Sequence, residues 1–159
     1  MLGIYHPLLV HFPLGALTTT FVLVFLGAII PSRRKAFLTS ALILVILGTI
    51  GLWVTLEAGE SAAEMISKRS LTSEALHDLN DHSELAEKTM VGFAAFSVIF
   101  IFYLCFESRF PRVLQNLFPA LLVVIYAGLL VFLTLTGHYG GKLVHKHGLH
   151  TPMYNDADE

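Results

Sequence analysis

Four long runs of apolar residues, none of which contains a charged side chain, dominate the chain. They extend over residues 12–30, 36–56, 89–106 and 113–137. Each run is close to the roughly 20 residues that an α-helix needs to cross the hydrocarbon core of a bilayer. No water is present there to satisfy backbone groups, so a spanning segment of this length has to be helical. With their flanks, the runs predict transmembrane helices at about 5–30, 36–57, 84–107 and 113–138.

The polar connections between these runs predict how the helices are oriented. Two connections are short and basic and contain proline: one carries Arg33-Arg34-Lys35, and the other carries Arg109 and Arg112. Basic residues in short loops are typical of the cytoplasmic side. The long middle segment, residues 57–88, carries eight acidic residues against Lys68, Arg69 and Lys88, so we place it outside. The predicted fold is therefore an all-α, integral membrane four-helix bundle with both termini outside.

The middle segment also shows helical patterns of its own. Residues 62–67 and 73–79 predict short amphipathic helices in the outer loop between the second and third spans. Residues 81–84 (Asp-His-Ser-Glu) resemble a capping box, which predicts that the third helix begins there, with His82 in its first turn. In the fourth span, Pro119 is expected to kink the helix, and neighbouring groups should take up the freed carbonyl. We expect one domain, residues 1–150, a flexible tail at 151–159, and no internal repeat.

Composition supports the membrane assignment and narrows the chemistry. Of the 159 residues, 55% are hydrophobic and 14% are charged, well below the ~25% charged residues of a soluble domain. The net charge is −2, and no extended basic face favours nucleic acid as a partner. Cys105 is the only cysteine, which excludes an internal disulfide, cysteine-based zinc and iron–sulfur sites, and covalent c-type haem attachment. Any cofactor must therefore be held non-covalently, mostly by nitrogen and oxygen ligands.

Histidines are the residues most suited to such ligation, and the predicted topology places all of them outside. They are His6, His11, His77, His82, His138, His145, His147 and His150. Histidine also tolerates membrane interfaces, so this distribution does not require a bound group. His11 lies at the edge of an apolar run, where an imidazole without a partner is costly, and His138 closes another run at a similar depth. Depth matching therefore predicts a deep pair, His11 with His138, and a shallow pair, His6 with His82.

Two kinds of cofactor use paired histidines. A b-type haem takes two axial imidazoles from facing helices, and glycines such as Gly137, Gly140 and Gly141 would let the macrocycle approach the backbone. Lysines at the same end could meet its propionates. A copper or zinc ion would instead need three or four nitrogen or carboxylate ligands, which Glu57, Glu60 and Glu64 could complete. A third possibility is a structural subunit whose histidines bind nothing.

The two ends of the chain resemble a known family. The opening residues 6–15 (HPLLVHFPLG) and the closing residues 136–144 (TGHYGGKLV), followed by His147-Gly148, resemble a bacterial membrane family catalogued as domain of unknown function 2231 (DUF2231). Residues 82–86 (HSELA) fall where that family's pattern has a further histidine. The resemblance covers nearly the whole chain. It implies four helices, a histidine-rich outer face and a role for His147, while His145 stands where an aromatic residue is expected. Some relatives look fused to c-type cytochrome segments, which implies membrane electron transfer.

Together these observations predict a small cytochrome b-like electron-transfer subunit of the bacterial inner membrane. It would bind one or two b-type haems near the outer face and exchange electrons with the quinone pool, a c-type cytochrome or other subunits of a redox complex. The candidate haem-binding residues are His6, His11, His82, His138 and His147. The alternative is a copper or other transition-metal site. Its candidate ligands are His6, His11, His82 and His138.

Overall fold

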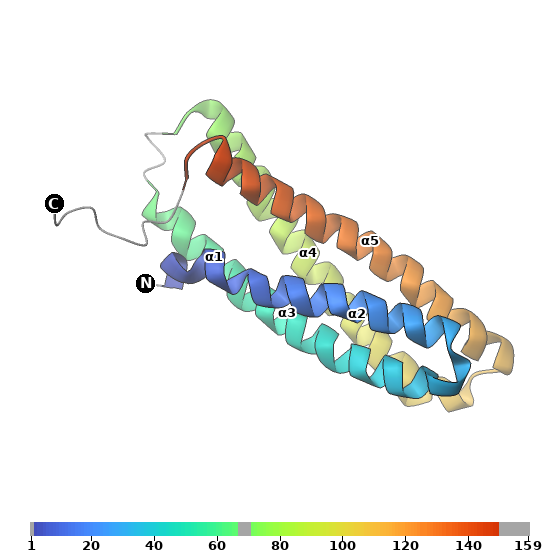
Figure 1. Ribbon diagram of the computed structural model, residues 1–159. Coiled ribbons are helices and arrows are strands. Elements are labelled where there is room, and N and C mark those ends of the chain that lie inside the picture. The colour runs from blue at the N-terminus through green and yellow to red at the C-terminus, as the bar shows by residue number, and fades with distance from the viewer. Residues whose placement is uncertain (1, 67–70, 150–159) are drawn as a thin grey trace.

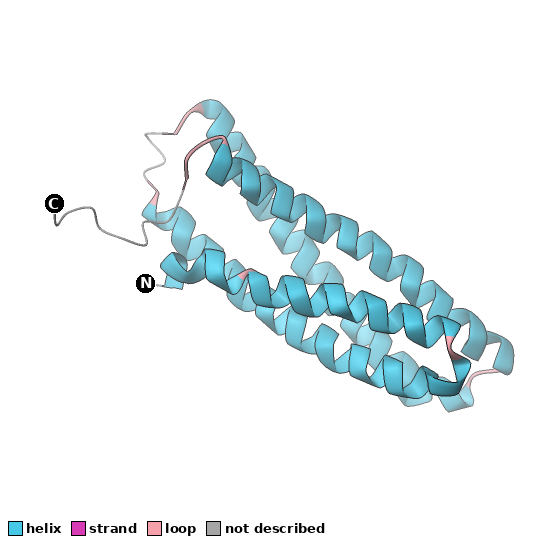
Figure 2. Ribbon diagram, in the orientation of Figure 1, coloured by secondary structure: helices cyan, strands magenta, loops and turns pink. Residues whose placement is uncertain are grey.

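A computed structural model describes residues 2–66 and 71–149, and within them the chain forms a bundle of long helices (Figure 1). The helices are α1 (His6–Leu9), α2 (His11–Ile29), α3 (Arg34–Met65), α4 (Ser73–Phe106) and α5 (Arg112–His145). Single-turn 3-10 helices, η1 (Leu2–Tyr5), η2 (Pro31–Arg33) and η4 (Glu107–Arg109), precede α1 or join the long helices. Short loops separate the described elements elsewhere (Figure 2), while residues 67–70, between α3 and α4, lie outside the described residues. The tail predicted to be flexible, and His150, lie outside the described residues.

Two helical hairpins make up the bundle. Helix α2 packs against α3, α4 packs against α5, and the hairpins meet through α3 with α4 and α2 with α5. The start of α1, the end of α3, the start of α4 and the end of α5 lie together at one end, which we call the histidine end (Figure 1). The short connections lie at the opposite end, which we call the basic end because it carries Arg33, Arg34, Lys35, Arg109 and Arg112.

At the histidine end the long helices extend further than hydropathy predicted. The segments at 62–67 and 73–79 are not separate helices, because residues 62–65 continue α3 and residues 73–79 begin α4. The hydroxyl of Thr72 accepts a hydrogen bond from the Ala75 amide (3.2 Å) and caps α4, so the capping-box pattern at residues 81–84 lies inside a helix. Hydropathy marks where the bilayer ends, whereas helical hydrogen bonding continues through good helix formers such as alanine and glutamate.

Prolines affect two of the helices in different ways. Pro13 has no N–H to donate to the carbonyl four residues earlier. The regular helical hydrogen bonding is interrupted at Val10, between α1 and α2. Pro119, in contrast, lies inside a continuous α5. The Gln115 carbonyl that it leaves free accepts hydrogen bonds from Arg34 Nη1 (3.0 Å) and from the Tyr103 hydroxyl (3.4 Å). The prediction that neighbouring groups would take up this carbonyl is therefore confirmed.

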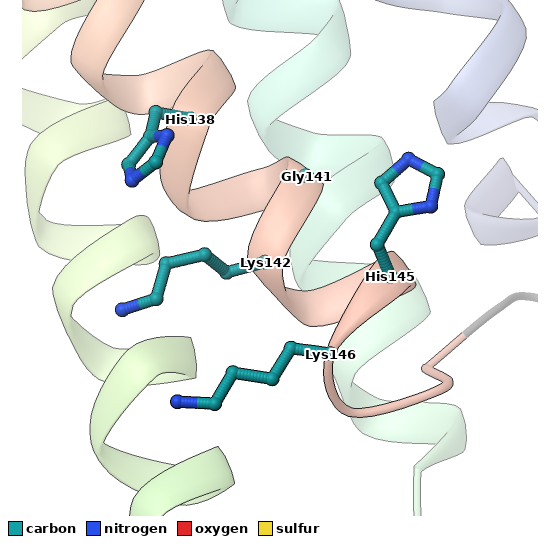
Figure 3. Close-up of a pocket in the computed structure, with 5 residues that line it drawn as sticks. All are labelled: His138, Gly141, Lys142, His145 and Lys146. Carbon is teal, nitrogen blue, oxygen red and sulfur yellow. The ribbon is translucent and has the colours of Figure 1, made fainter.

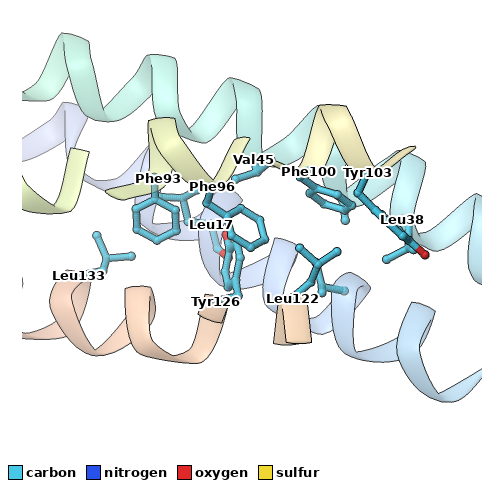
Figure 4. Packing of buried hydrophobic residues seen from close by; sticks show 12 residues of the cluster. Leu17, Leu38, Val45, Phe93, Phe96, Phe100, Tyr103, Leu122, Tyr126 and Leu133 are labelled. Atoms are coloured by element: carbon cyan, nitrogen blue, oxygen red, sulfur yellow. The ribbon is translucent and has the colours of Figure 1, made fainter. Parts of the chain in front are cut away.

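Aromatic and branched side chains fill the centre of the bundle (Figure 4). Tyr126 lies at the middle of this core, where its ring packs edge-on against Phe93 and Phe96, with centroids 5.5 and 5.0 Å apart. Its hydroxyl donates to the Leu17 carbonyl across the bundle (2.9 Å). Because Tyr126 belongs to α5 and Leu17 to α2, this contact joins the two hairpins.

The outer surface of the bundle is apolar along the four spans. At most 33% of the residues in the most apolar window of each helix are buried inside the structure. Large apolar side chains therefore face outward, among them Val98, Val113, Val124 and Val131. Four helices are long and apolar enough to cross a membrane. Such a surface requires lipid as its solvent, so the predicted membrane bundle is confirmed. The orientation, with both termini outside, stays a prediction.

Candidate functional site

The imidazole of His6 is held against the backbone of α3. Nδ1 of His6 donates a hydrogen bond to the Thr55 carbonyl (3.0 Å), and the side chain is half-buried. A Cβ added at Gly59, one turn further along α3, would lie 3.0 Å from Cε1 of this ring. Nearby, Gly3 packs so closely on α3 that an added Cβ would lie 2.6 Å from the Ala62 amide nitrogen. These glycines let η1 and the ring approach the helix.

The imidazole of His82 is held in the same way against α5. Its Nδ1 donates to the Thr136 carbonyl (3.0 Å), and its side chain is also half-buried. An added Cβ at Gly140 would lie 3.1 Å from Cε1 of the ring. The Thr136 hydroxyl is in turn 2.9 Å from the hydroxyl of Thr89, which lies on α4 two turns after His82. This contact between hydroxyls therefore joins the segment of α5 around Thr136 to α4, the helix to which His82 belongs.

The two settings are equivalent, one in each hairpin. In each hairpin, a histidine of the first helix donates a hydrogen bond to a threonine carbonyl of the second helix. The same ring lies against the glycine that follows this threonine by four residues. We call these two settings the imidazole seats: Thr55 with Gly59, and Thr136 with Gly140. The sequence pattern alone predicted no internal repeat and no role for Gly59. The signal that could have revealed the repeat is the Thr-x-x-x-Gly spacing shared by the second and fourth spans.

The remaining ring nitrogen of each seated histidine is suited to bind a ligand. Because Nδ1 donates to a carbonyl, Nε2 of the neutral ring carries the lone pair. Neither Nε2 makes a hydrogen bond in the described part of the chain. Yet no fully buried side-chain nitrogen there lacks a hydrogen-bond partner, so both Nε2 atoms open onto accessible space.

The deep pair predicted from sequence lies in a different environment. His11 is exposed at the start of α2, and its Nδ1 donates to the Pro7 carbonyl one turn earlier (2.9 Å). His138 is exposed on α5, with its ring near that of Tyr139. It lines an open hollow with Lys142 and Lys146 on the side of α5 that faces α4, as Figure 3 shows. No hydrogen bond or ring contact joins His11 to His138 among the described residues. Their ligation of a haem stays a prediction.

His147, which the family resemblance implicates, belongs to an ion-pair cluster. Its Nε2 donates to Asp78 Oδ2 (2.8 Å), and Lys142 Nζ donates to Asp78 Oδ1 (2.7 Å). The side chains of His147 and Asp78 are only 8% and 6% exposed. This cluster ties the start of α4 to the end of α5, beside the seat of His82. Its Nε2 is therefore engaged by a carboxylate in this structure, and ligation of a cofactor by His147 stays a prediction.

The Asp78 cluster makes the histidine end sensitive to acid. Asp78 precedes the charge-free run of α4 that begins at Thr89, so it lies outside the membrane-spanning segment. The hydrogen bond from Lys142, and then that from His147, holds the pKa of Asp78 at about 2, below its usual 3.8. A carboxyl with a lowered pKa contributes stability above its usual pKa and loses this contribution as the pH falls to the folded value.

We therefore expect the thermal unfolding midpoint of the protein to fall between about pH 4 and about pH 2 as this contribution is lost. The Asp78→Asn variant should have a lower midpoint at neutral pH, because Lys142 and His147 lose their carboxylate. Its midpoint should also change less than that of the wild type over the acidic range. If the unfolding midpoints of the two proteins instead fell in parallel as the pH was lowered, Asp78 would not be the group responsible for the loss of stability in acid.

The acidic and imidazole groups do not form a multi-ligand metal site. Within residues 2–66 and 71–149, no group of three or more His, Cys, Asp or Glu side chains is arranged to hold a metal ion. Glu57, Glu60 and Glu64, proposed above as extra ligands, are all exposed on α3. A bare copper or zinc ion needs more protein ligands than the two seats supply.

Four lipid-facing helices and the paired imidazole seats define the protein as a multi-pass helical membrane protein with a histidine site at one end. The chain belongs to the family described as predicted membrane protein (DUF2231), whose family model matches residues 5–152. This match confirms the resemblance carried by the terminal motifs. No curated protein and no solved structure matches the chain.

Proposed function

We propose that the protein is a cytochrome b-like subunit in which His6 and His82 are the axial ligands of one b-type haem. The observation that carries the proposal is the pair of imidazole seats. Each ring is oriented by a backbone carbonyl, each Nε2 remains available, and each hairpin contributes one ring. Histidines that ligate metals nearly always donate their other ring N–H in this manner.

The chemistry of the donor set fits this group better than it fits a bare ion. A bis-histidine haem takes two protein ligands, because the porphyrin supplies the other four, and it provides reversible one-electron transfer when bound. Gly59 and Gly140 leave room for the imidazole rings themselves to lie against α3 and α5. Lys142 and Lys146 lie at the same end but are paired with Asp78 and Glu74, so their contacts with haem propionates would have to compete with these carboxylates.

The position of the site indicates how the protein would work in a redox complex. In the part of the chain that the structure describes, every histidine lies in, or directly after, an element of the histidine end, so these residues offer no second bis-histidine centre at the basic end. Electron exchange would then occur at one face, with a quinone, a c-type cytochrome or another subunit as donor or acceptor. The predicted orientation makes this the periplasmic face. A reporter fused after Glu159 should be active only outside the cytoplasm, and cytoplasmic activity would reverse this assignment.

The optical spectrum of the purified protein tests the proposal most directly. We expect the reduced protein to show the sharp α band of a low-spin bis-histidine haem, with about one haem per polypeptide. Copper found by elemental analysis without a porphyrin band would favour the metal-binding alternative instead. Protein that holds neither, even after reconstitution with haem, would leave a structural role as the remaining function.

A further inference from the structure

The basic end of the bundle differs from the histidine end in how its charges are balanced. All five ion pairs of the described residues lie at the histidine end or in the first turns of α4. None involves the five basic residues of the basic end, where Glu107 is the only acid. Five positive charges against one negative charge leave an excess of four. Arg34 is half-buried and the other four are exposed, and a cluster of basic residues next to membrane-spanning helices favours an anionic partner.

A hollow of about 400 Å³ lies among these charges, between the two short connections. Its lining includes Arg34 and Lys35 from the start of α3, Tyr103 and Ser108 from the α4 side, and Gln115 from α5; the carboxylate of Glu107 also lines it. Helix α3 begins at this hollow with no side-chain cap and no acid in its first turn. Its first N–H groups and its dipole therefore favour negative charge at the same place.

The guanidinium of Arg34 is fixed at this site by neutral groups alone. Nη1 donates to the Gln115 carbonyl and to the Asn116 side-chain oxygen, both at 3.0 Å, and Nε donates to the Gly27 carbonyl at 3.3 Å. These contacts position the charge without neutralising it, and Nη2 makes no hydrogen bond within the described residues. Lys35 is exposed and makes no ion pair or side-chain hydrogen bond in the same part of the chain.

We propose that this hollow binds the phosphate of an anionic phospholipid, with Lys35 and Arg34 as its cationic contacts. The hollow lies where the membrane-spanning helices end, at the depth of lipid headgroups. Basic pockets between helix ends on the cytoplasmic side are suited to such headgroups. A lipid phosphate there would stabilise the bundle, because it would contact the connections of both hairpins. This inference does not depend on whether the histidine end binds haem.

The test compares thermal unfolding of the purified protein in mixed micelles at constant ionic strength. Phosphatidylglycerol should raise the unfolding midpoint of the wild type by several degrees relative to phosphatidylcholine. Lys35→Gln should lose most of that shift. Arg33→Gln removes the same charge from an exposed neighbour that does not line the hollow, so it should keep the shift.

Three results would overturn the proposal. The first is no difference between the two lipids for the wild type. The second is an equal loss in Lys35→Gln and Arg33→Gln, which would show diffuse attraction rather than a site. The third is an equal shift with inorganic phosphate, which would show that a lipid is not required.

Discussion

Replacing either His6 or His82 with alanine is expected to abolish the low-spin haem spectrum of the protein. Each seat supplies one of the two axial ligands, so the remaining histidine cannot replace the one that is lost. Each variant should therefore lose the haem or retain it in a high-spin form. Each substitution removes a half-buried side chain that lies outside the aromatic core around Tyr126, so the bundle should still fold. Haem quantified per polypeptide, together with the reduced spectrum, measures the effect.

Matched controls come from the other histidines of the same end. His77→Ala removes an exposed imidazole that only approaches Asp81 on its own helix, and the spectrum should not change. His11→Ala and His138→Ala decide between the shallow and deep pairs. If these two variants lose the haem while His6→Ala and His82→Ala keep it, the deep pair predicted from sequence is the ligand pair. Loss of about half the haem in each of the four variants would instead indicate two centres.

Much of the fold could be predicted from the sequence because the bilayer imposes simple rules. The charge-free runs predict four helices, and the prolines, glycines and basic residues between them mark the connections. The helix ends were predicted less well. Glu57 follows the second charge-free run and Lys88 precedes the third, but α3 and α4 extend past these residues, since backbone hydrogen bonds form in water as well as in lipid. Helix α4 is capped at Thr72, and the similar capping pattern at residues 81–84 lies inside the helix.

The candidate site was only partly predictable. The rise per residue places His6 and His82 at similar depths, so depth matching could pair them, and the structure holds both rings against Thr-x-x-x-Gly segments; their ligation of one haem stays a prediction. The carbonyls of Thr55 and Thr136 could not be predicted, because every residue has a carbonyl and only the packing of helices selects one. The same limit applies to His147, whose partner Asp78 is distant in sequence. His11 lies at the edge of an apolar run, but the sequence does not show towards which side its ring points.

Replacing the glycine of a seat with alanine should weaken haem binding without removing a ligand. At Gly140 the new Cβ would lie 3.1 Å from Cε1 of His82, which is closer than ordinary packing, so the ring must shift by a few tenths of an ångström, and this strains its hydrogen bond to the Thr136 carbonyl. Losing one such hydrogen bond costs about 1 kcal/mol, which corresponds to about fivefold weaker haem retention. Gly59→Ala should act in the same way on His6.

Gly137 and Gly141 provide the comparison on the same stretch of α5, because a Cβ added at either of them meets nothing within 4 Å. Alanine stabilises a helix relative to glycine by up to about 1 kcal/mol, so Gly137→Ala and Gly141→Ala should keep the haem and unfold no earlier than the wild type. Haem transfer to apomyoglobin gives the retention of each variant, and thermal unfolding gives its stability. If Gly140→Ala releases haem no faster than Gly141→Ala, the close contact between Gly140 and His82 does not hold the ligand, and the equivalence of the two seats would have no functional meaning.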